Sequence, residues 1–516
     1  MKQVLIFLLS ALLLNCCNGT EEPAYVPKPV IEVTFGRFIG DGVVISVNSL
    51  NVTEVYAMAC KPTDEAPTAE VIAANGTPEE NGEITISGLK KDTDYAIYAV
   101  GVSEDTFSTI QKISVTIPAL YAWEAERTGI LDFADLDLLP GGILNKTPNT
   151  WSEYRLLPHV TFTDEDGQEK WLHEAFLFIG SEDAERNRIF CIAEGKNHSG
   201  NKESWADFAE YWMGSNGVIK TLDQTIASGI SRIGTPSFGK HKVVMTMPDP
   251  IMLEYFYDKS SSTKYWGEAF DHNLDFSKQT DQVLAYMWFI DYIRDLWAKA
   301  SPQNIELAGF YILSEVLVAK SDGWNYQYKK WDKILPSVSD YLHSMNYGMY
   351  WIPYYQADGY DMTDKLGIDY TWLQPNKYWD YPEKKQKKDW AWVFGSMNTY
   401  GHGMEIEFEG SHGEPGWSQY EEGVARTSSS ILETVRTDND AQGTKKGRPN
   451  PQAARNKALL RDYMQQFKNA GYYGKARIAT YSGTDAMYEL ASSPDEKDKE
   501  MYLEYCRFIV NSPLRK

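Results

Sequence analysis

The chain has 516 residues, more than one small domain needs, and its formal net charge of -22 argues against nucleic acid as a partner, because phosphate contacts require clustered Lys and Arg. Hydrophobic residues make up 43% of the chain, enough for a large core, and the aromatic share of 13% is high. Aromatic side chains in such number either fill a large core or line grooves for flat apolar faces such as sugar rings.

The N-terminus has the form of a bacterial lipoprotein signal. A positively charged start precedes the apolar residues 4–14, a run too short to span a bilayer. The following Leu-Leu-Asn-Cys-Cys-Asn-Gly resembles a lipobox, in which we favour Cys17 over Cys16 as the acylated residue; an ordinary cleaved signal is the alternative. The acidic pair at 21–22 resembles the surface-export signals of some gut-type Gram-negative bacteria. We therefore expect a signal peptide over residues 1–17 and a protein lipid-anchored in the outer membrane, facing outside.

The next segment, residues 18–29, is polar and contains three prolines, which is typical of a tether between lipid and fold. Beyond the signal, three scattered cysteines remain, Cys60, Cys191 and Cys506. Three thiols cannot all pair, and no C-x-x-C occurs, so we expect buried thiols in place of a disulfide scaffold or a zinc cluster.

Residues 30–118 are expected to form an all-β sandwich of the immunoglobulin or fibronectin type III kind, because short β-branched and aromatic runs alternate with Gly- and Asn-rich turns. The clearest runs lie at 43–47, 54–60, 84–89 and 95–100. Leu89 and Tyr95 have the spacing of the tyrosine corner of fibronectin type III domains. No catalytic motif occurs in this segment, so we expect a spacer, with carbohydrate binding as the alternative.

From residue 119 to residue 516 the pattern changes to alternating strands and helices. Strand candidates lie at 159–162, 175–179, 242–247, 305–313, 348–354, 368–373, 404–408 and 476–481. Helix candidates with apolar residues every three or four positions lie at 278–300, 328–345, 384–398 and 454–470. This order predicts an α/β TIM-type (β/α)8 barrel. A doubly wound open sheet is the alternative, but the sequence lacks the Gly-rich phosphate loop that usually follows its first strand.

Residues 403–410 read Gly-Met-Glu-Ile-Glu-Phe-Glu-Gly and alternate strictly between apolar and acidic side chains. In a β-strand alternate residues share a face, so Glu405, Glu407 and Glu409 should point the same way. The pattern fits a solvated edge strand. It also fits a barrel strand with apolar residues under the outer helices and acids in the mouth.

In such barrels the catalytic and binding residues lie at the carboxyl ends of the strands, and this rule selects two candidate catalytic carboxylates. Glycoside hydrolysis usually needs two carboxyl groups across the scissile bond, one to protonate the leaving oxygen and one to attack the anomeric carbon or activate water. We expect Glu315 and Glu407 to be this catalytic pair, because Glu405 lies deeper in its strand and Glu409 already belongs to the loop. Clustered acids also repel, which raises one pKa and makes a proton available near neutral pH.

Amides, further acids and aromatic rings at the same strand ends are expected to bind the substrate. These residues are Trp351, Tyr354, Gln356, Asp358, Gln374, Asn376, Glu405, Glu409 and Asp249.

Four motifs occur in a fixed order: Gly-Phe-Tyr-Ile-Leu-Ser-Glu at 309–315, Trp-Ile-Pro-Tyr-Tyr-Gln-Ala-Asp-Gly at 351–359, Leu-Gly-Ile-Asp-Tyr at 366–370 with Gln-Pro-Asn at 374–376, and Glu-Ile-Glu-Phe-Glu at 405–409. Together they resemble a bacterial family known as domain-of-unknown-function family 4855, over roughly residues 120 to 490. The resemblance implies a glycoside-hydrolase-like barrel and no defined substrate. Ile312 and Leu313 depart from the more polar or aromatic pair expected before Glu315.

Three functions remain open: a surface glycoside hydrolase, a glycan-binding lipoprotein that has lost the reaction, and a structural surface protein with no ligand. A carbohydrate is the expected partner, and no cofactor or metal is expected. The sequence contains no H-E-x-x-H and no G-x-S-x-G, which argues against a zinc protease and a serine hydrolase of that type. Thr-Asp-Glu-Asp-Gly at 163–167 is expected to form a hairpin turn, not a calcium loop.

Overall fold

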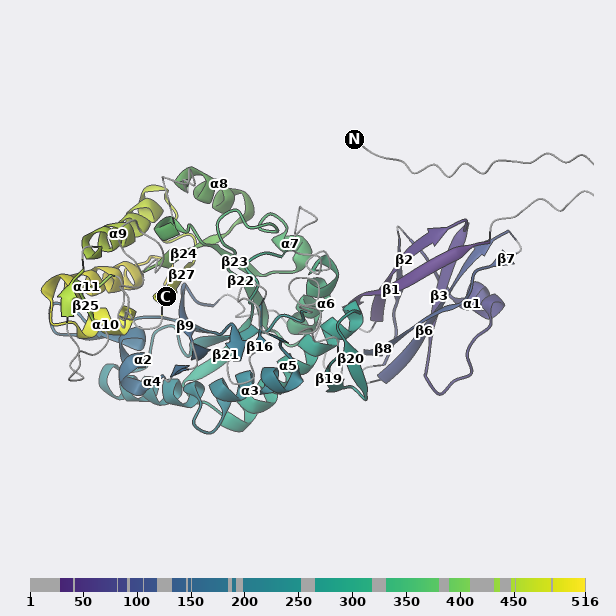
Figure 1. The fold of residues 1–516 in the computed structure, drawn as a ribbon, viewed down its shortest axis with the longest axis horizontal. Helices are drawn as coiled ribbons and strands as arrows, with labels where there is room; N and C mark the ends of the chain where they lie inside the picture. The colour runs from purple at the N-terminus through teal and green to yellow at the C-terminus, as the bar shows by residue number, and fades with distance from the viewer. Residues whose placement is uncertain are drawn as a thin grey trace, which may run out of the picture.

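The computed structural model describes residues 28–39, 42–80, 82–90, 93–104, 106–117, 132–144, 147–149, 151–183, 188–191, 198–251, 265–317, 331–379, 389–408, 431–436, 447–450, 452–483 and 486–515. A β-sandwich and a closed barrel lie side by side (Figure 1). The expected signal, the acylation site and residues 18–27 of the expected tether lie outside the described residues. Within the described ranges we find no helix long and apolar enough to cross a membrane.

The N-terminal region is a two-sheet antiparallel sandwich, as predicted. One sheet contains β1 (Val30–Ile39), β2 (Gly42–Leu50) and β5 (Glu83–Ile86). The other contains β3 (Glu54–Cys60), β4 (Thr77–Pro78), β6 (Thr93–Ser103), β7 (Thr106–Phe107) and β8 (Gln111–Ile117), and the short helix α1 (Ala69–Asn75) follows β3. Alternate apolar residues of β1 and β2, including Ile31, Val33 and Ile45, are buried between the sheets.

The predicted tyrosine corner is present. The hydroxyl oxygen of Tyr95 accepts a hydrogen bond from the backbone N–H of Lys90 at 3.0 Å, and Leu89 packs against the core. The bond joins the start of β6 to the turn before it, which is the contact that defines this corner in fibronectin-like sandwiches.

The C-terminal region is a closed eight-stranded parallel barrel, which confirms the predicted fold class. In barrel order its strands are β9 (Asp135–Pro140), β14 (Ala175–Ile179), β18 (His241–Met247), β21 (Ile305–Ile312), β22 (Gly348–Trp351), β23 (Tyr370–Leu373), β24 (Gly403–Glu407) and β27 (Ile478–Tyr481). The order in the barrel is the order along the chain, so each strand pairs with its successor and β27 closes on β9.

The first strand was predicted at the wrong place. Residues 159–162 belong to the end of helix α2 (Glu153–Val160) and to β12 (Thr161–Thr163), and the true first strand is β9. Its sequence, Asp-Leu-Asp-Leu-Leu-Pro, carries two acids and lacks the β-branched run typical of a buried strand. Both acids are buried because the surrounding helices and strands supply partners: Asp137 contacts His159 Nδ1 at 2.6 Å.

The outer helices follow the expected pattern. They are α2, α3 (Lys202–Met213), α4 (Val218–Ile233), α5 (Gln279–Ala300), α6 (Trp331–Ser344), α7 (Thr363–Leu366), α8 (Trp390–Tyr400), α9 (Ala453–Asn469), α10 (Ala486–Ser492) and α11 (Glu496–Val510). In α5 the residues Val283, Met287 and Ile290 are buried, as their spacing predicted. The helix expected at 384–398 begins later, at Trp390, where the Asp389 carboxylate accepts a hydrogen bond from the backbone N–H of Ala391.

Short strands lie in the connections between the barrel strands and the helices. They are β10 (Gly142–Leu144), β11 (Thr147–Asn149), β12, β13 (Glu169–Trp171), β15 (Glu182–Asp183), β16 (Arg188–Ile189), β17 (His198–Ser199), β19 (Tyr265–Ala269), β20 (His272–Asp275), β25 (Thr434–Arg436) and β26 (Gly447–Pro449). Strands β12 and β13 are antiparallel, and the Asp164 carboxylate accepts from the backbone N–H groups of Asp166 and Gln168 between them. This confirms the hairpin turn at 163–167.

Aromatic rings fill the amino-terminal part of the barrel. Phe133, just before β9, stacks on Trp372 with ring centroids 6.3 Å apart and meets Tyr350 edge-on at 5.9 Å. Glycine is required beside these rings, since a Cβ at Gly403 would come within 2.7 Å of the Trp372 ring, and one at Gly309 within 2.7 Å of Tyr350. With this end packed by rings, polar side chains gather at the carboxyl end of the strands.

The sandwich and the barrel share one hydrophobic core. Strand β1 packs against α5 and α6, which lie on the side of the barrel (Figure 1). Buried side chains form a continuous cluster that runs from the sandwich, for example Phe35, into the barrel wall at Phe310. The two regions are therefore joined by apolar packing as well as by the chain between them.

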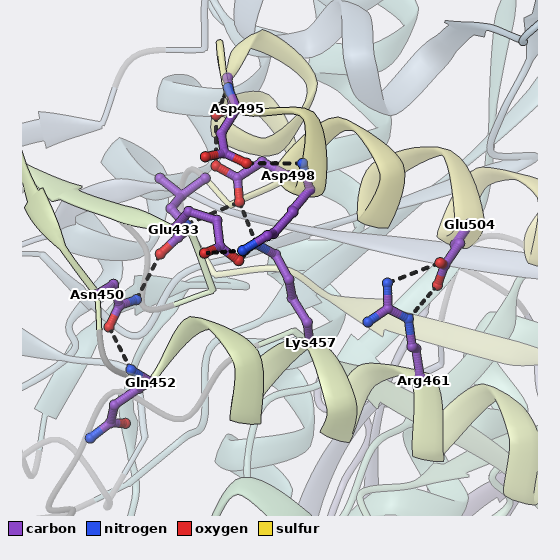
Figure 2. Close-up of polar contacts among 11 residues, drawn as sticks. Glu433, Asn450, Gln452, Lys457, Arg461, Asp495, Asp498 and Glu504 are labelled. Carbon is purple, nitrogen blue, oxygen red and sulfur yellow. Dashed lines mark hydrogen bonds and ion pairs between the residues drawn. The ribbon is translucent and has the colours of Figure 1, made fainter.

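A buried ion pair fixes the β25–β26 hairpin, which belongs to the long connection from β24 to α9. Lys457 of α9 donates from Nζ to Glu433 Oε1 at 2.7 Å and to Asp498 Oδ1 at 2.5 Å (Figure 2). Asp498 also accepts from the backbone N–H of Glu433 and from the Ser493 hydroxyl. Beside this cluster a two-bond ion pair between Arg461 and Glu504 joins α9 to α11.

Candidate active site

The two predicted catalytic carboxylates both lie at the carboxyl end of the barrel. Glu315 follows β21, the fourth strand in barrel order, and Glu407 ends β24, the seventh. The alternation read in the sequence decides how β24 is oriented. Met404 and Ile406 pack outward into a core shared with α9 and α11, so Glu405 and Glu407 face the barrel interior.

A chain of hydrogen bonds joins the two carboxylates. Gln374 donates from Nε2 to Glu315 Oε1 at 3.0 Å, and its own Oε1 accepts from Asn376 Nδ2 at 3.1 Å. Asn376 Nδ2 also donates to Glu407 Oε1 at 3.3 Å. Four residues predicted independently from strand ends are thus brought together.

Local backbone geometry fixes the direction of the Asn376 amide. Asn376 has a positive φ of 49°, a conformation that Asn adopts more readily than most residues. Its Oδ1 accepts a hydrogen bond from the backbone N–H of Tyr355 at 2.6 Å. With Oδ1 held in this way, Nδ2 must point toward Gln374 and Glu407.

Tyr463 of α9 is a site residue that the sequence reasoning missed. Its hydroxyl donates to Glu407 Oε2 and accepts from the backbone N–H of Lys377 at 2.9 Å. The side chain is fully buried, 56 residues along the chain from Glu407. The available signal was a Tyr on the apolar face of a predicted helix, whose hydroxyl needs a partner when buried.

Burial and mutual repulsion shift the carboxyl groups upward. Burial raises the pKa of Glu407 to about 7, with a smaller rise from the Glu315 charge, while hydrogen bonds from Tyr463 and Asn376 oppose the shift. Burial raises the pKa of Glu405 well above its usual range, and the charges of Glu407 and Glu315 raise it further. Burial likewise raises the pKa of Tyr311, a second interior residue that the sequence reasoning missed, with help from Glu315 and Glu405.

Asp249 and Trp351, predicted to bind substrate, hold the residue next to Glu315. Ser314 donates from Oγ to Asp249 Oδ2 at 2.5 Å, and its carbonyl oxygen accepts from Trp351 Nε1 at 2.7 Å. Both side chains are fully buried, so in this structure the Trp351 ring is not open to a ligand. Burial raises the pKa of Asp249 to about 7, against hydrogen bonds from Ser314 and Tyr286.

The remaining predicted residues lie on the loop after β22. Tyr354 is exposed, and burial of part of its ring raises its pKa, with Asp358 and Glu315 contributing. Gln356 is exposed and has a positive φ of 58°, and Asp358 is half-buried. Glu409 lies outside the described residues, as do Cys16 and Cys17.

Solved structures with distant similarity include carbohydrate-active enzymes. A multi-modular cell-surface chitinase from Paenibacillus sp. str. FPU-7 shares 10% identity at a TM-score of 0.33, covering 95% of this chain and 41% of that one. A β-glucuronidase from Ruminococcus gnavus shares 9% sequence identity at a TM-score of 0.28. The match covers 88% of this chain and 62% of that one. The fn3 domain of the human collagen alpha-1(XX) chain shares 15% sequence identity at a TM-score of 0.15. The match covers 19% of this chain and 90% of that one. At these values the matches say nothing about activity.

No curated protein matches the chain. A family model described as Domain of unknown function (DUF4855) matches residues 136–438, which include all the barrel strands except the last and the first residue of β9. The match spans more than half of the sequence and contains Glu315, Gln374, Asn376 and Glu407. The chain belongs to the DUF4855 family.

Proposed function

We propose that the protein is a glycoside hydrolase acting on a polysaccharide or glycan, with Glu315 and Glu407 as its catalytic carboxyl groups. The observation that supports this is the hydrogen-bonded chain Glu315–Gln374–Asn376–Glu407 at the carboxyl end of a closed barrel. Its members come from the ends of the fourth, sixth and seventh strands. Glycoside hydrolysis usually requires two carboxyl groups, and the amides between them can bind sugar hydroxyls.

The hydrogen bonds support a division of roles. Both oxygens of Glu407 accept hydrogen bonds, from Asn376 and Tyr463, an arrangement that suits an ionised carboxylate because a proton on either oxygen would compete with a donor. We assign Glu407 as the nucleophile, or as the base that activates water. Glu315 is exposed, and we assign it as the acid. Its proton passes to the glycosidic oxygen, which keeps the electron pair of the breaking C–O bond, while Glu407 or its water bonds to the anomeric carbon.

Hydrolysis assays on a panel of polysaccharides test the proposal. We expect Glu315→Gln and Glu407→Gln each to lower kcat/KM at least about 100-fold, since each removes a proton-transfer or attacking group. Glu496→Gln, on a residue 87% exposed on α11, is the matched control and should retain full turnover. Unchanged turnover in both site variants would show that the site is wrong. Glycan binding without any turnover would favour the glycan-binding lipoprotein.

We also propose that the protein is anchored by lipid at Cys17 on the outer surface of a Gram-negative outer membrane. The apolar residues 4–14, the lipobox-like motif and the acidic pair at 21–22 support this location. Metabolic labelling with a clickable fatty acid should mark wild type and Cys16→Ala but not Cys17→Ala. Labelled Cys17→Ala protein, or protease resistance of the protein on intact cells, would contradict it.

A further inference from the structure

Glu405 is a third carboxyl group at this end of the barrel, and neither proposed catalytic role uses it. It lies two residues before Glu407 on the same inward face of β24, and only 2% of its surface is exposed. Among the residues that the structure describes, none forms a hydrogen bond with its carboxyl group. Buried polar groups almost always have a partner, so a carboxyl with none among the described residues, beside a proposed sugar site, is available to water or to a ligand hydroxyl.

The surroundings of Glu405 are acidic. The charged groups that act on it are Glu407 and Glu315, and no Lys, Arg or His in the described ranges opposes them. Another interior neighbour is Tyr311, which carries a hydroxyl group and whose pKa is raised by burial and, further, by the Glu315 and Glu405 charges. A ligand carboxylate or sulfate placed here would add a further negative charge beside carboxyl groups that already repel one another in a region of low dielectric. A sugar hydroxyl or amine would instead donate to the Glu405 oxygens.

We propose that Glu405 forms the inner wall of the sugar site and selects a sugar unit that carries no negative charge, excluding uronic acids and sulfated sugars. The inference rests on the proposed glycosidase site, because it places the sugar between Glu315 and Glu407. Glu405 acts as a specificity-determining residue, and Glu407 and Glu315 keep the bond-breaking roles.

Binding of matched sugar mimics to the full chain tests this without turnover. The probes are isofagomine-type iminosugars of gluco, galacto and manno configuration, each in a hydroxymethyl form and in a uronic form that differs only by the carboxylate. By isothermal titration calorimetry we expect the best hydroxymethyl probe to bind at least about 100-fold more tightly than its uronic counterpart, as like-charge repulsion of a few kcal/mol requires. Equal binding of the two forms, or no binding by any probe, would overturn the inference.

Substitution of the residue itself sharpens the test. Glu405→Gln keeps the shape of the side chain and removes its ionisable carboxyl group, so the ratio between the two probe forms should fall by at least about tenfold. Glu306→Gln, at the opposite end of the barrel, should leave the ratio unchanged. A ratio unaltered in Glu405→Gln contradicts the proposal. If that variant does not fold, the wild-type ratio alone decides, and a ratio near one contradicts the proposal.

The two proposals fail in different ways. If the probes discriminate as expected but no glycan is hydrolysed, the selectivity of the site stands and the glycosidase proposal falls. If Glu315→Gln abolishes hydrolysis of a uronic or sulfated glycan, the glycosidase stands and the selectivity assigned to Glu405 is wrong.

Discussion

The hydroxyl of Tyr463 has one proton and two partners, and its geometry decides where that proton goes. Because the Lys377 N–H donates to the hydroxyl oxygen, the hydroxyl hydrogen is directed at Glu407. The bond lowers the pKa of Glu407 from the value that burial alone would give. Tyr463 is therefore a positioning residue for Glu407 that also adjusts its ionisation.

If the protein has the proposed glycosidase activity, removing this hydroxyl should shift the pH profile of that activity. In Tyr463→Phe the pKa of Glu407 should rise above its present value of about 7, by roughly one unit, so the acidic limb of kcat/KM moves to higher pH. The pH dependence of kcat/KM measures this directly. Tyr473→Phe, which removes a hydroxyl bonded to the Phe508 carbonyl away from the site, is the control. Superimposable profiles for Tyr463→Phe and wild type would contradict the assignment.

Asp249 should make the stability of the barrel depend on pH. Its pKa is raised by burial from 3.8 to about 7, so the folded state binds the proton more tightly than the unfolded state. Its contribution therefore weakens as pH rises from about 4 to about 7, by about 1.4 kcal/mol per pH unit. Asp249→Asn removes this pH-dependent contribution to the free energy of unfolding and keeps an acceptor for Ser314.

Denaturant unfolding at several pH values checks the sign. Relative to wild type, Asp249→Asn should gain stability as pH rises through that window and level off above it. Asp332→Asn, on the exposed face of α6, should follow wild type at every pH. A difference between Asp249→Asn and wild type that is independent of pH would mean that this carboxyl keeps its ordinary pKa in the fold.

At the scale of elements, the buried ion pair of Lys457 fixes the β25–β26 hairpin to two helices. Lys457→Met should destabilise the protein by about 3–5 kcal/mol, because it leaves Asp498 buried without its cation. Chemical denaturation measures the loss. Lys497→Met removes a cation that is 72% exposed and 3.5 Å from Glu433, and should change stability by about 1 kcal/mol or less. Equal losses in the two variants would show that burial of the pair is unimportant.

Seven barrel strands were predictable because each is a buried apolar run between helical patterns, as in Lys-Val-Val-Met-Thr-Met before Pro248. Strand β9 was not, because its Asp135 and Asp137 look polar until Arg515 and His159 are brought beside them by the fold. Local sequence carries the burial pattern of an element but not the distant partner that permits a buried charge.

The candidate site likewise has parts that the local sequence predicts and parts that depend on tertiary packing. The location of Glu315 and Glu407 at the carboxyl end of the barrel was predictable from the order of elements, because the ends of parallel strands meet there. That Trp351 faces away from the interior and holds Ser314 depends on register, which moves every side chain to the other face when it shifts by one residue. The contact of Tyr463 with Glu407 depends on how α9 packs over β24, and no spacing in the sequence encodes that packing.

At the scale of the whole molecule, the sandwich and the barrel should unfold together. Their buried side chains form one cluster through β1, α5 and α6, so separating them exposes apolar surface on both. Calorimetry should give a single transition, and deletion of residues 28–117 should lower the Tm of the barrel. Two separable transitions, or an unchanged barrel Tm, would instead support the independent spacer expected from the sequence.

Helix α9 carries both Tyr463, bonded to Glu407, and Lys457, which holds the β25–β26 hairpin. The two residues lie six positions apart on one rigid helix, about 9 Å along its axis. We therefore expect occupancy of the proposed site and docking of the hairpin to be thermodynamically linked through α9. By reciprocity, a ligand that tightens the packing around Glu407 should protect the hairpin from opening, and a partner that lifts the hairpin should weaken the binding of that ligand.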